Sequence, residues 1–329
     1  MPKVSNPKIS IIVPSYNRAE FIEATLVSIQ NQTFKDFEVI FIDDGSTDNT
    51  AELVKAFCDK DPRFKYFKQE NSERAVARSY GLGLATADLL CLVDSDDLWY
   101  SHKLEKQVEV MDADPSVALC YAAVNRIDME GNPTKTSSRQ HQGLSGFIFY
   151  DLLMRNFIPS VTPMFRKKAF EKVGSQVTEF IPYEDWDFWL KFSRQGKFHH
   201  ISEPLGDYRL HPGQSVKNVR AEHIEKVTTL VLDNNTKKEN ININSYKNRS
   251  FDSRDFDEQV KEAYSLANLR FAYWYLVSGN RALAKDRLIK SCDYSNSRKF
   301  DYRWYGLWIA YFMNPVCGDS ITKLLGSFH

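Results

Sequence analysis

The chain has 329 residues, of which 43% are hydrophobic and 26% are charged, as expected for a globular protein of one large domain or two. Basic and acidic residues number 43 each, so no basic excess favours nucleic-acid binding. The five cysteines are scattered without Cys-x-x-Cys spacing, which argues against a disulfide framework or a zinc site. We see no signal peptide and no run of about 18 apolar residues, and expect a cytoplasmic protein, free or peripheral at the inner face of the membrane.

Strand and helix signals alternate through the first hundred residues. Short β-branched or aromatic runs predict strands, and apolar residues at helical spacing predict helices between them. The predicted strands cover residues 9–13, 37–42, 64–67 and 89–93. Three helices are predicted between them: one begins near residue 21, a second ends near residue 58 and a third runs over 73–84. This order predicts a parallel sheet covered by helices, which is an α/β fold.

The signals continue less regularly to about residue 210. Helices are predicted over 102–112, 146–156 and 184–194, and strands over 117–123, 162–165 and 198–201. The polar segment 134–143 is expected to be a mobile loop. We predict a first domain over residues 1–233, a polar linker over 234–255 and a helical region over 256–329. The aromatic segment 302–312 is read either as a core helix or as a helix lying at a membrane surface.

The strand predicted at residues 89–93 ends in three carboxylates within four residues, in the order Asp94, Ser95, Asp96 and Asp97. Such a charge density is costly unless a cation binds there, and Mg²⁺ or Mn²⁺ prefers oxygen ligands from carboxylates and phosphates. Open α/β sheets place their ligands at this carboxyl edge. The alternative is a solvated acidic turn or a helix N-cap.

Several motifs end predicted strands at that same edge, and together they resemble the family 2 glycosyltransferases. The resemblance covers roughly residues 8 to 215, and its specificity comes from the order of the motifs more than from any one of them. They are Ile-Ile-Val-Pro-Ser-Tyr-Asn-Arg (11–18), Ser-Ile-Gln-Asn-Gln-Thr-Phe (28–34), Val-Ile-Phe-Ile-Asp-Asp-Gly-Ser-Thr-Asp (39–48), Ala-Arg-Ser-Tyr-Gly (77–81) and Leu-Val-Asp-Ser-Asp-Asp (92–97).

The resemblance implies a GT-A fold, to which the helical region predicted over 256–329 would be a C-terminal extension. It also implies an inverting transferase that uses Mn²⁺ or Mg²⁺. Its donor would be a nucleotide-sugar, usually a UDP-sugar, and its acceptor a glycan or lipid-linked hydroxyl in cell-surface polysaccharide or glycoconjugate synthesis. Two alternatives stay open: a non-catalytic nucleotide-sugar binding protein, and a nucleotidyltransferase. The first is disfavoured by the intact acidic motifs, and the second by the lack of a glycine-rich loop after the first strand.

The family motifs assign the donor-binding residues one by one. Pro14 and Tyr16 match the loop that contacts the nucleobase, and Asp44 matches the carboxylate that accepts from the uracil ring, although Asp44 could also be a plain N-cap. Arg78 matches the arginine of an Ala-Arg-Asn-x-Gly motif whose asparagine is a serine here, and Arg74 is a second candidate for the pyrophosphate. Either arginine could instead be a solvated helix residue.

The acidic motif matches the family's Asp-x-Asp element. Asp94 and Ser95 would contact the donor, while Asp94, Asp96 or Asp97 would bind the metal. His211 follows a Tyr-Arg-Leu segment that resembles a family segment near the donor phosphates, and it could be a further metal ligand or a polar loop residue.

An acceptor hydroxyl needs a base, because it is a weak nucleophile until its proton is removed. Glu184 and Asp185 match the family's Glu-Asp motif at the start of a predicted helix. We assign Asp185 as the general base, with Glu184 as the second candidate. The alternative is that both simply interact with the positive end of the helix dipole.

Overall fold

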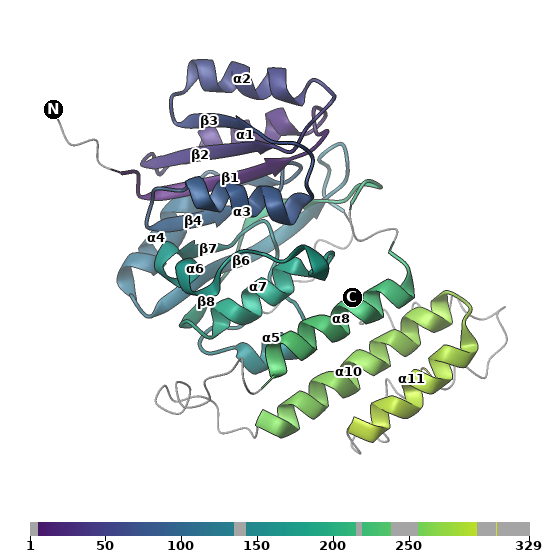
Figure 1. The fold of residues 1–329 in the computed structure, drawn as a ribbon. Helices are drawn as coiled ribbons and strands as arrows, with labels where there is room; N and C mark the ends of the chain where they lie inside the picture. Colours follow the sequence, from purple (N-terminus) through teal and green to yellow (C-terminus); the bar gives the residue numbers. More distant parts are fainter. Residues whose placement is uncertain (1–5, 135–142, 215–218, 238–255, 295–306, 308–329) are drawn as a thin grey trace. The chain divides into compact units, whose positions relative to one another are not determined.

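The computed structural model describes residues 6–134, 143–214, 219–237, 256–294 and 307 (Figure 1). The chain divides into two compact units, one of residues 1–149 and 157–214 and the other of residues 150–156 and 215–329. This division groups residues 215–233 with the second unit, and the domain boundary predicted at 233 stays a prediction. Most of the expected linker, the loop over 135–142 and the aromatic segment except Leu307 lie outside the described residues.

The described part of the first unit contains an eight-stranded sheet in the order β3-β2-β1-β4-β7-β6-β8-β5. Neighbours among β1 to β4 are parallel, as are β6 and β8, whereas β7 is antiparallel to β4 and β6, and β5 is antiparallel to β8. The strands are β1 (Ile9–Ser15), β2 (Phe37–Asp43), β3 (Phe64–Lys68), β4 (Leu89–Leu92), β5 (Leu98–Trp99), β6 (Val117–Ile127), β7 (Met164–Arg166) and β8 (Lys197–Arg209).

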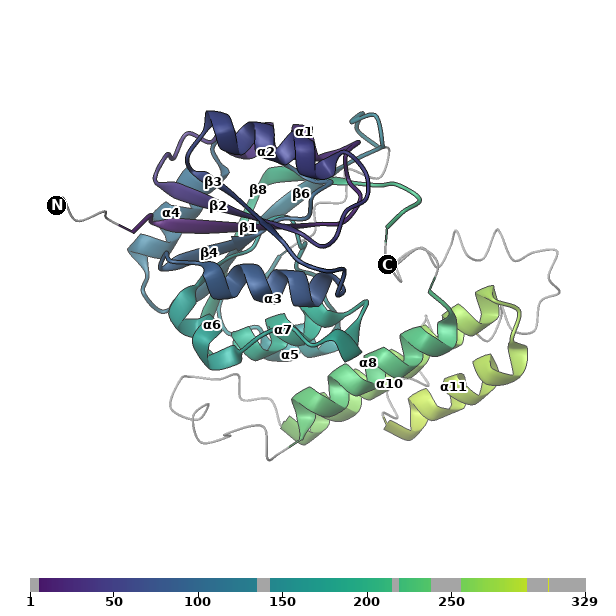
Figure 2. The same cartoon turned by 45° about the horizontal axis from the view of Figure 1, so that its top comes forward.

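Helices cover both faces of this sheet, with α1 and α2 on one face and α3, α6 and α7 on the other (Figure 2). Successive side chains of a strand point to opposite faces of the sheet. Every second residue of β1, Ile9, Ile11 and Val13, therefore packs on the same face, in one core cluster with residues of α1, α2 and α4. The helices of this unit are α1 (Ile22–Gln30), α2 (Thr50–Lys60), α3 (Arg74–Leu84), α4 (Lys103–Ala113), α6 (Lys167–Val173) and α7 (Glu184–Ser193), with a 3-10 turn at Thr178–Phe180.

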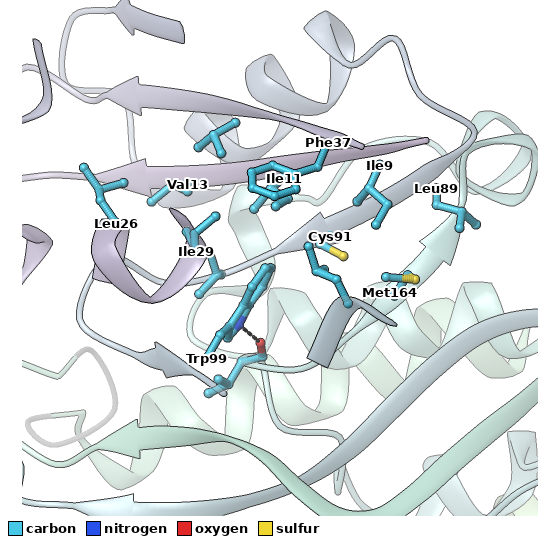
Figure 3. Packing of buried hydrophobic residues seen from close by; sticks show 14 of the residues in the cluster. Ile9, Ile11, Val13, Leu26, Ile29, Phe37, Leu89, Cys91, Trp99 and Met164 are labelled. Carbon is cyan, nitrogen blue, oxygen red and sulfur yellow. Dashed lines mark hydrogen bonds between the residues drawn. The ribbon is translucent and has the colours of Figure 1, made fainter. Parts of the chain in front are cut away.

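The core on the first face reaches the segment that follows the acidic motif (Figure 3). Trp99 of β5 is 4% exposed, packs in this cluster and donates its indole N–H to the carbonyl of Val161 at 2.8 Å. A buried indole with a satisfied N–H anchors its segment firmly. The turn over residues 94–97 is therefore held between the buried strand β4 before it and the buried Trp99 of β5 after it.

Helix α3 lies very close to the opposite face of the sheet. A Cβ at Gly81 would lie 2.5 Å from Cγ2 of Ile12 in β1 and 3.1 Å from Cγ1 of Ile42 in β2. Only glycine permits this approach without displacing the helix. Because α3 follows β3, its first two turns, which carry Arg74 and Arg78, lie near the carboxyl edge of the parallel strands.

The predicted α/β alternation is confirmed up to β4, and the later elements differ in extent. Strand β8 runs from Lys197 to Arg209, well beyond the predicted residues 198–201, because it pairs with the long β6 through register irregularities. The helix predicted over 146–156 is limited to α5 (Phe149–Met154). Strand β5 and helix α6 were not predicted, because two and seven residues are too short to show a periodic pattern.

The second unit is helical, as predicted. It contains most of α5 together with α8 (Ala221–Thr236), α10 (Phe256–Val277) and α11 (Arg281–Tyr294). Glu225 of α8 joins all three long helices, since it accepts from the hydroxyl of Tyr275 at 2.9 Å and pairs with Arg287 at 2.6 Å. None of the helices within the described residues is long and apolar enough to cross a membrane.

Candidate active site

The loops after β1 and β2 are tied together by backbone and side-chain hydrogen bonds. The amide of Asp44 donates to the carbonyl of Ser15 at 2.8 Å, and the amide of Asn17 donates to Ser46 Oγ at 3.0 Å. Pro14 is buried in the strand, whereas Tyr16 is 45% exposed at the start of the loop. The ring of Tyr16 is therefore accessible to a ligand, and Pro14 supports the loop from inside.

Asp44 is nearly buried at the end of β2 and is not a helix N-cap. Its Oδ1 accepts from Gln69 Nε2 at 2.7 Å and from the amide of Ser72 at 3.0 Å, and both donors come from the segment between β3 and α3. Helix α2 begins six residues later, where Asp48 accepts from the amide and the hydroxyl of Thr50. The carboxylate of Asp44 is thus fixed between the loop after β2 and the segment before α3.

Arg78 joins two distant segments of the chain. Its guanidinium donates to Oδ1 of Asp94 and, at 3.0 Å, to Oε1 of Glu184. Burial opposes the charge of Arg78, but the carboxylates of Asp94 and Glu184 outweigh it and raise the pKa of the guanidinium. Arg78 is therefore a permanently charged bridge between the acidic motif and the Glu-Asp motif, and not a solvated helix residue.

Glu184 is bound by both arginines of α3. Arg74 donates through Nε to Oε1 of Glu184 and, at 2.8 Å, through a terminal nitrogen to Oε2, while Arg78 also uses Oε1. Glu184 is 1% exposed. Both of its oxygens are engaged by arginines, which makes Glu184 an anchor of the site.

Asp185 differs from its neighbour. It is partly exposed, and its Oδ1 accepts from the amide of Trp186 at 2.7 Å. Burial and the negative charge of Glu184 raise the pKa of Asp185 to about 6, against the lowering effect of the two arginines. A carboxylate with a pKa near neutrality is well matched to removing a proton from a hydroxyl.

The three aspartates of the acidic motif have different environments. Asp94 accepts from Arg78 and, at 3.2 Å, from the hydroxyl of Ser160; burial opposes its charge, but Arg78 keeps its pKa below the usual range. Asp96 Oδ2 lies 2.9 Å from His211 Nε2 and 3.4 Å from Arg18 Nε. Ser95 is 5% exposed, and its carbonyl accepts from the side chain of α1 residue Thr25 at 3.2 Å.

Asp97 is completely buried, and its Oδ1 accepts from the amide of Arg209 at 3.0 Å. Burial and the charges of Asp96 and Asp94 raise the pKa of Asp97 well above its usual value. Its neighbours are therefore better placed than Asp97 to meet a ligand. Two arginines already balance part of the negative charge of this motif, since Arg78 pairs with Asp94 and Arg18 with Asp96. The charge density alone therefore does not require a metal.

Carboxylates of the acidic motif and of the Glu-Asp motif both influence the side chain of Tyr208. The hydroxyl of Tyr208 in β8 has its pKa raised by burial and then by four carboxylates, those of Asp97, Asp94, Asp96 and Asp185. Together with the bridge through Arg78, this places the candidate donor carboxylates and the candidate base at one site.

Asp96 and His211 are the residues best placed to hold a divalent cation. A carboxylate oxygen and an imidazole nitrogen 2.9 Å apart are donors that Mn²⁺ accepts. Across the described residues, no group of three or more His, Cys, Asp or Glu side chains could hold a metal ion by itself. A cation held by these two side chains would take its further ligands from phosphate and water, as Mg²⁺ does in many nucleotide sites.

Sequence reasoning missed three residues at the site. Arg18, which lies 3.4 Å from Asp96, was given no role although it ends the 11–18 motif. Ser160 contacts Asp94, and Oε1 of Gln176 accepts from Arg78 at 3.4 Å. Arg18 belongs to a recognised motif and could have been considered. Ser160 and Gln176 lie in irregular segments with no motif to indicate them.

Solved structures with a similar fold carry sugar nucleotides. S. aureus TarS residues 1–349 in complex with UDP-GlcNAc aligns with a TM-score of 0.61 over 87% of this chain and 91% of that chain, at 20% identity. Mannosyltransferase PcManGT from Pyrobaculum calidifontis, in complex with GDP-Man and Mn²⁺, aligns with a TM-score of 0.58 over 98% of this chain and 89% of that chain, at 17% identity. At these identities the likeness concerns the fold, which is the GT-A fold.

Curated relatives match in sequence as well. An uncharacterized glycosyltransferase of Rickettsia bellii is 31% identical over 69% of this chain, which spans only 33% of that relative. The putative teichuronic acid biosynthesis glycosyltransferase TuaG of Bacillus subtilis is 31% identical over 62% of this chain and 79% of its own length. The family model "Glycosyl transferase family 2" matches residues 10–174. The chain therefore belongs to glycosyltransferase family 2.

Proposed function

We propose that the protein is an inverting glycosyltransferase that moves a sugar from a nucleotide-sugar, of which a UDP-sugar is the first candidate, to an acceptor hydroxyl. One observation carries the proposal: Arg78 binds Asp94 and Glu184, which are 90 residues apart in sequence, so that donor and acceptor functions share one site. A protein that only bound nucleotide-sugars would have no use for Asp185 beside that bridge.

The nucleoside would lie over the loops after β1 and β2. Tyr16 offers an exposed ring, and Asp44 offers a fixed carboxylate to a ring N–H of the base. Asp94 would contact the ribose or the sugar, while Arg74 is the more exposed of the two α3 arginines and the better placed for a phosphate. The exposure of Tyr16, Arg74 and Asp94 supports their roles, and the fixed position of the carboxylate supports that of Asp44.

A divalent cation fits at Asp96 and His211. When bound, Mn²⁺ or Mg²⁺ would draw charge from the diphosphate leaving group, a Lewis-acid contribution of several kcal/mol. The protein would position that cation through Asp96, while Asp94 stays paired with Arg78.

Asp185 would be the base. As the acceptor oxygen forms its bond to the anomeric carbon, the bond from that carbon to the diphosphate breaks, and the acceptor proton passes to a carboxylate oxygen of Asp185. Inversion follows from a single displacement of this kind. Glu184 would hold the arginines, and its charge keeps the pKa of Asp185 high enough to accept a proton efficiently.

The acceptor class is proposed from the relatives. TuaG is named for teichuronic acid biosynthesis, so a cell-surface polysaccharide or glycoconjugate precursor is the acceptor to test first. TarS and PcManGT are bound to UDP-GlcNAc and GDP-Man, which makes these two compounds the first donors to test.

The test is release of nucleoside diphosphate from a panel of UDP- and GDP-sugars with Mn²⁺ or Mg²⁺, for the wild type and Asp185→Asn. We expect release from at least one donor in the wild type and none above background in the variant. Binding of a donor without release in any acceptor mixture would favour a binding protein, and release of pyrophosphate from a nucleoside triphosphate and a sugar phosphate would indicate a nucleotidyltransferase.

A further inference from the structure

We propose that Arg18 competes with the divalent cation for Asp96 and moves to the donor diphosphate when the cation binds, so that metal and nucleotide each strengthen the binding of the other. The inference rests on the metal-assisted donor binding proposed above and adds a role for a residue of the β1 loop.

Arg18 and His211 share one oxygen of Asp96. The distances to Oδ2 are 3.4 Å from Arg18 Nε and 2.9 Å from His211 Nε2. A divalent cation that binds Asp96 beside His211 would stand next to the guanidinium of Arg18. Two neighbouring positive groups repel each other strongly in a partly desolvated site. Arg18 must therefore weaken the binding of the divalent cation when no nucleotide is present.

The backbone of Arg18 is fixed while its side chain can move. The amide of Arg18 donates to Thr50 Oγ1 at 2.9 Å, which ties the loop to α2. The guanidinium makes other bonds only within its own loop among the described contacts, to the carbonyls of Tyr16 at 3.4 Å and Asn17 at 3.1 Å. These are weak anchors, and the long side chain can swing from Asp96 without disturbing the loop.

Comparison with Arg78 indicates which arginine is displaceable. Arg78 is 7% exposed and holds two carboxylates, Asp94 and Glu184. Arg18 is 28% exposed and holds one carboxylate, which it shares with a histidine. Losing a partly exposed single pair costs little free energy, whereas breaking a buried double pair costs several times more. Of the two arginines, Arg18 is therefore the one that a bound metal ion displaces from its carboxylate.

A bound diphosphate reverses the effect of Arg18. The phosphates bring negative charge to the cation, and a guanidinium beside them gains a partner that it can bind through two parallel hydrogen bonds. Arg18 therefore disfavours the cation alone and favours the cation together with the nucleotide. This difference makes the pair bind together and limits capture of free metal.

The experiment measures Mn²⁺ binding by electron paramagnetic resonance, without nucleotide and with UDP, in four proteins. These are the wild type, Arg18→Gln, Arg18→Lys and the control Arg63→Gln. Arg63 is a suitable control because it pairs with one carboxylate, that of Asp61, and its side chain is 26% exposed, close to the value for Arg18. It thus removes the same charge in a similar environment at the start of β3.

We expect Arg18→Gln to bind Mn²⁺ alone about three- to tenfold more tightly than the wild type, and UDP with Mn²⁺ more weakly by a similar factor. Arg18→Lys keeps the charge and should bind Mn²⁺ alone like the wild type, and Arg63→Gln should change neither affinity. Equal or weaker Mn²⁺ binding by Arg18→Gln would overturn the competition, as would Arg18→Lys behaving like Arg18→Gln. If the wild type binds Mn²⁺ neither alone nor with UDP, the proposed metal site is itself wrong.

Discussion

Replacement of Glu184 by glutamine tests the central bridge of the site. The side chain keeps its size but loses the charge that Arg74 and Arg78 bind. The glutamine carbonyl oxygen can still accept a hydrogen bond, whereas the glutamine NH₂ group must face an arginine nitrogen that is itself a donor. The variant therefore separates the anchoring role of Glu184 from the base role assigned to Asp185.

The cost in stability follows from the burial of the partners. Removing one member of a buried ion pair costs about 3–5 kcal/mol. Arg74 is 27% exposed, so water can solvate part of its charge, and Arg78 keeps Asp94 as a partner. We therefore expect the free energy of unfolding to fall by about 2–3 kcal/mol, measured as a shift of the urea midpoint at unchanged slope.

The effect on the pH profile has a definite sign. A base must be deprotonated, so activity in the wild type should fall as the pH decreases through the Asp185 pKa of about 6. Burial is the main cause that raises this pKa, and the negative charge of Glu184 is the second, while the two arginines lower it. The Glu184→Gln substitution removes the raising charge and leaves the arginines less neutralised, so the acidic limb should move to lower pH, by about one unit.

The assay is the pH dependence of kcat/KM for nucleoside diphosphate release with the donor found in the screen. Glu179→Gln is the matched control, because Glu179 is exposed and lies five residues earlier in the chain. An acidic limb that stays in place, or moves to higher pH, would refute the assignment of Asp185 as the base under the influence of Glu184. Loss of the acidic limb altogether would assign the proton to Glu184 itself.

Three further substitutions test the individual roles. Asp185→Asn should lower kcat by about 10²–10⁴-fold and leave the calorimetric affinity for UDP nearly unchanged; activity within tenfold of the wild type would contradict the base role. Asp96→Ala should weaken UDP binding in the presence of Mn²⁺ but not in its absence, and equal losses in both conditions would exclude a metal role. Asp44→Ala should weaken UDP binding by about 1–3 kcal/mol and leave pyrophosphate binding unchanged; a parallel loss of both would show that Asp44 supports the loops only.

The sequence was sufficient to predict the first half of the fold and the main motifs. Each parallel strand is a compact apolar run that ends in polar residues, so Asp44 and Asp94 could be placed at the carboxyl edge without a structure. The family motifs supplied Glu184 and Asp185. What local patterns cannot give is pairing: nothing near Arg78 indicates that its two partners are 16 and 106 residues away.

The same limit explains the residues that were missed. Strand β5 owes its place to pairing with β8, and its two residues carry no periodic signal of their own. Ser160 contacts Asp94 only because the segment before β7 returns to the sheet between β4 and β6. Long-range return of this kind depends on the strand order, which the sequence pattern did not reveal.

The double pairing of Arg78 has a consequence for how variation at this site is interpreted. A change at Asp94 releases one side of the guanidinium and so alters what Glu184 experiences, and the reverse also holds. Substitutions in the two motifs should therefore show epistasis. A library that randomises one motif in a fixed background would score as intolerant some residues that become acceptable once the other motif varies with it, so the two segments are best diversified together.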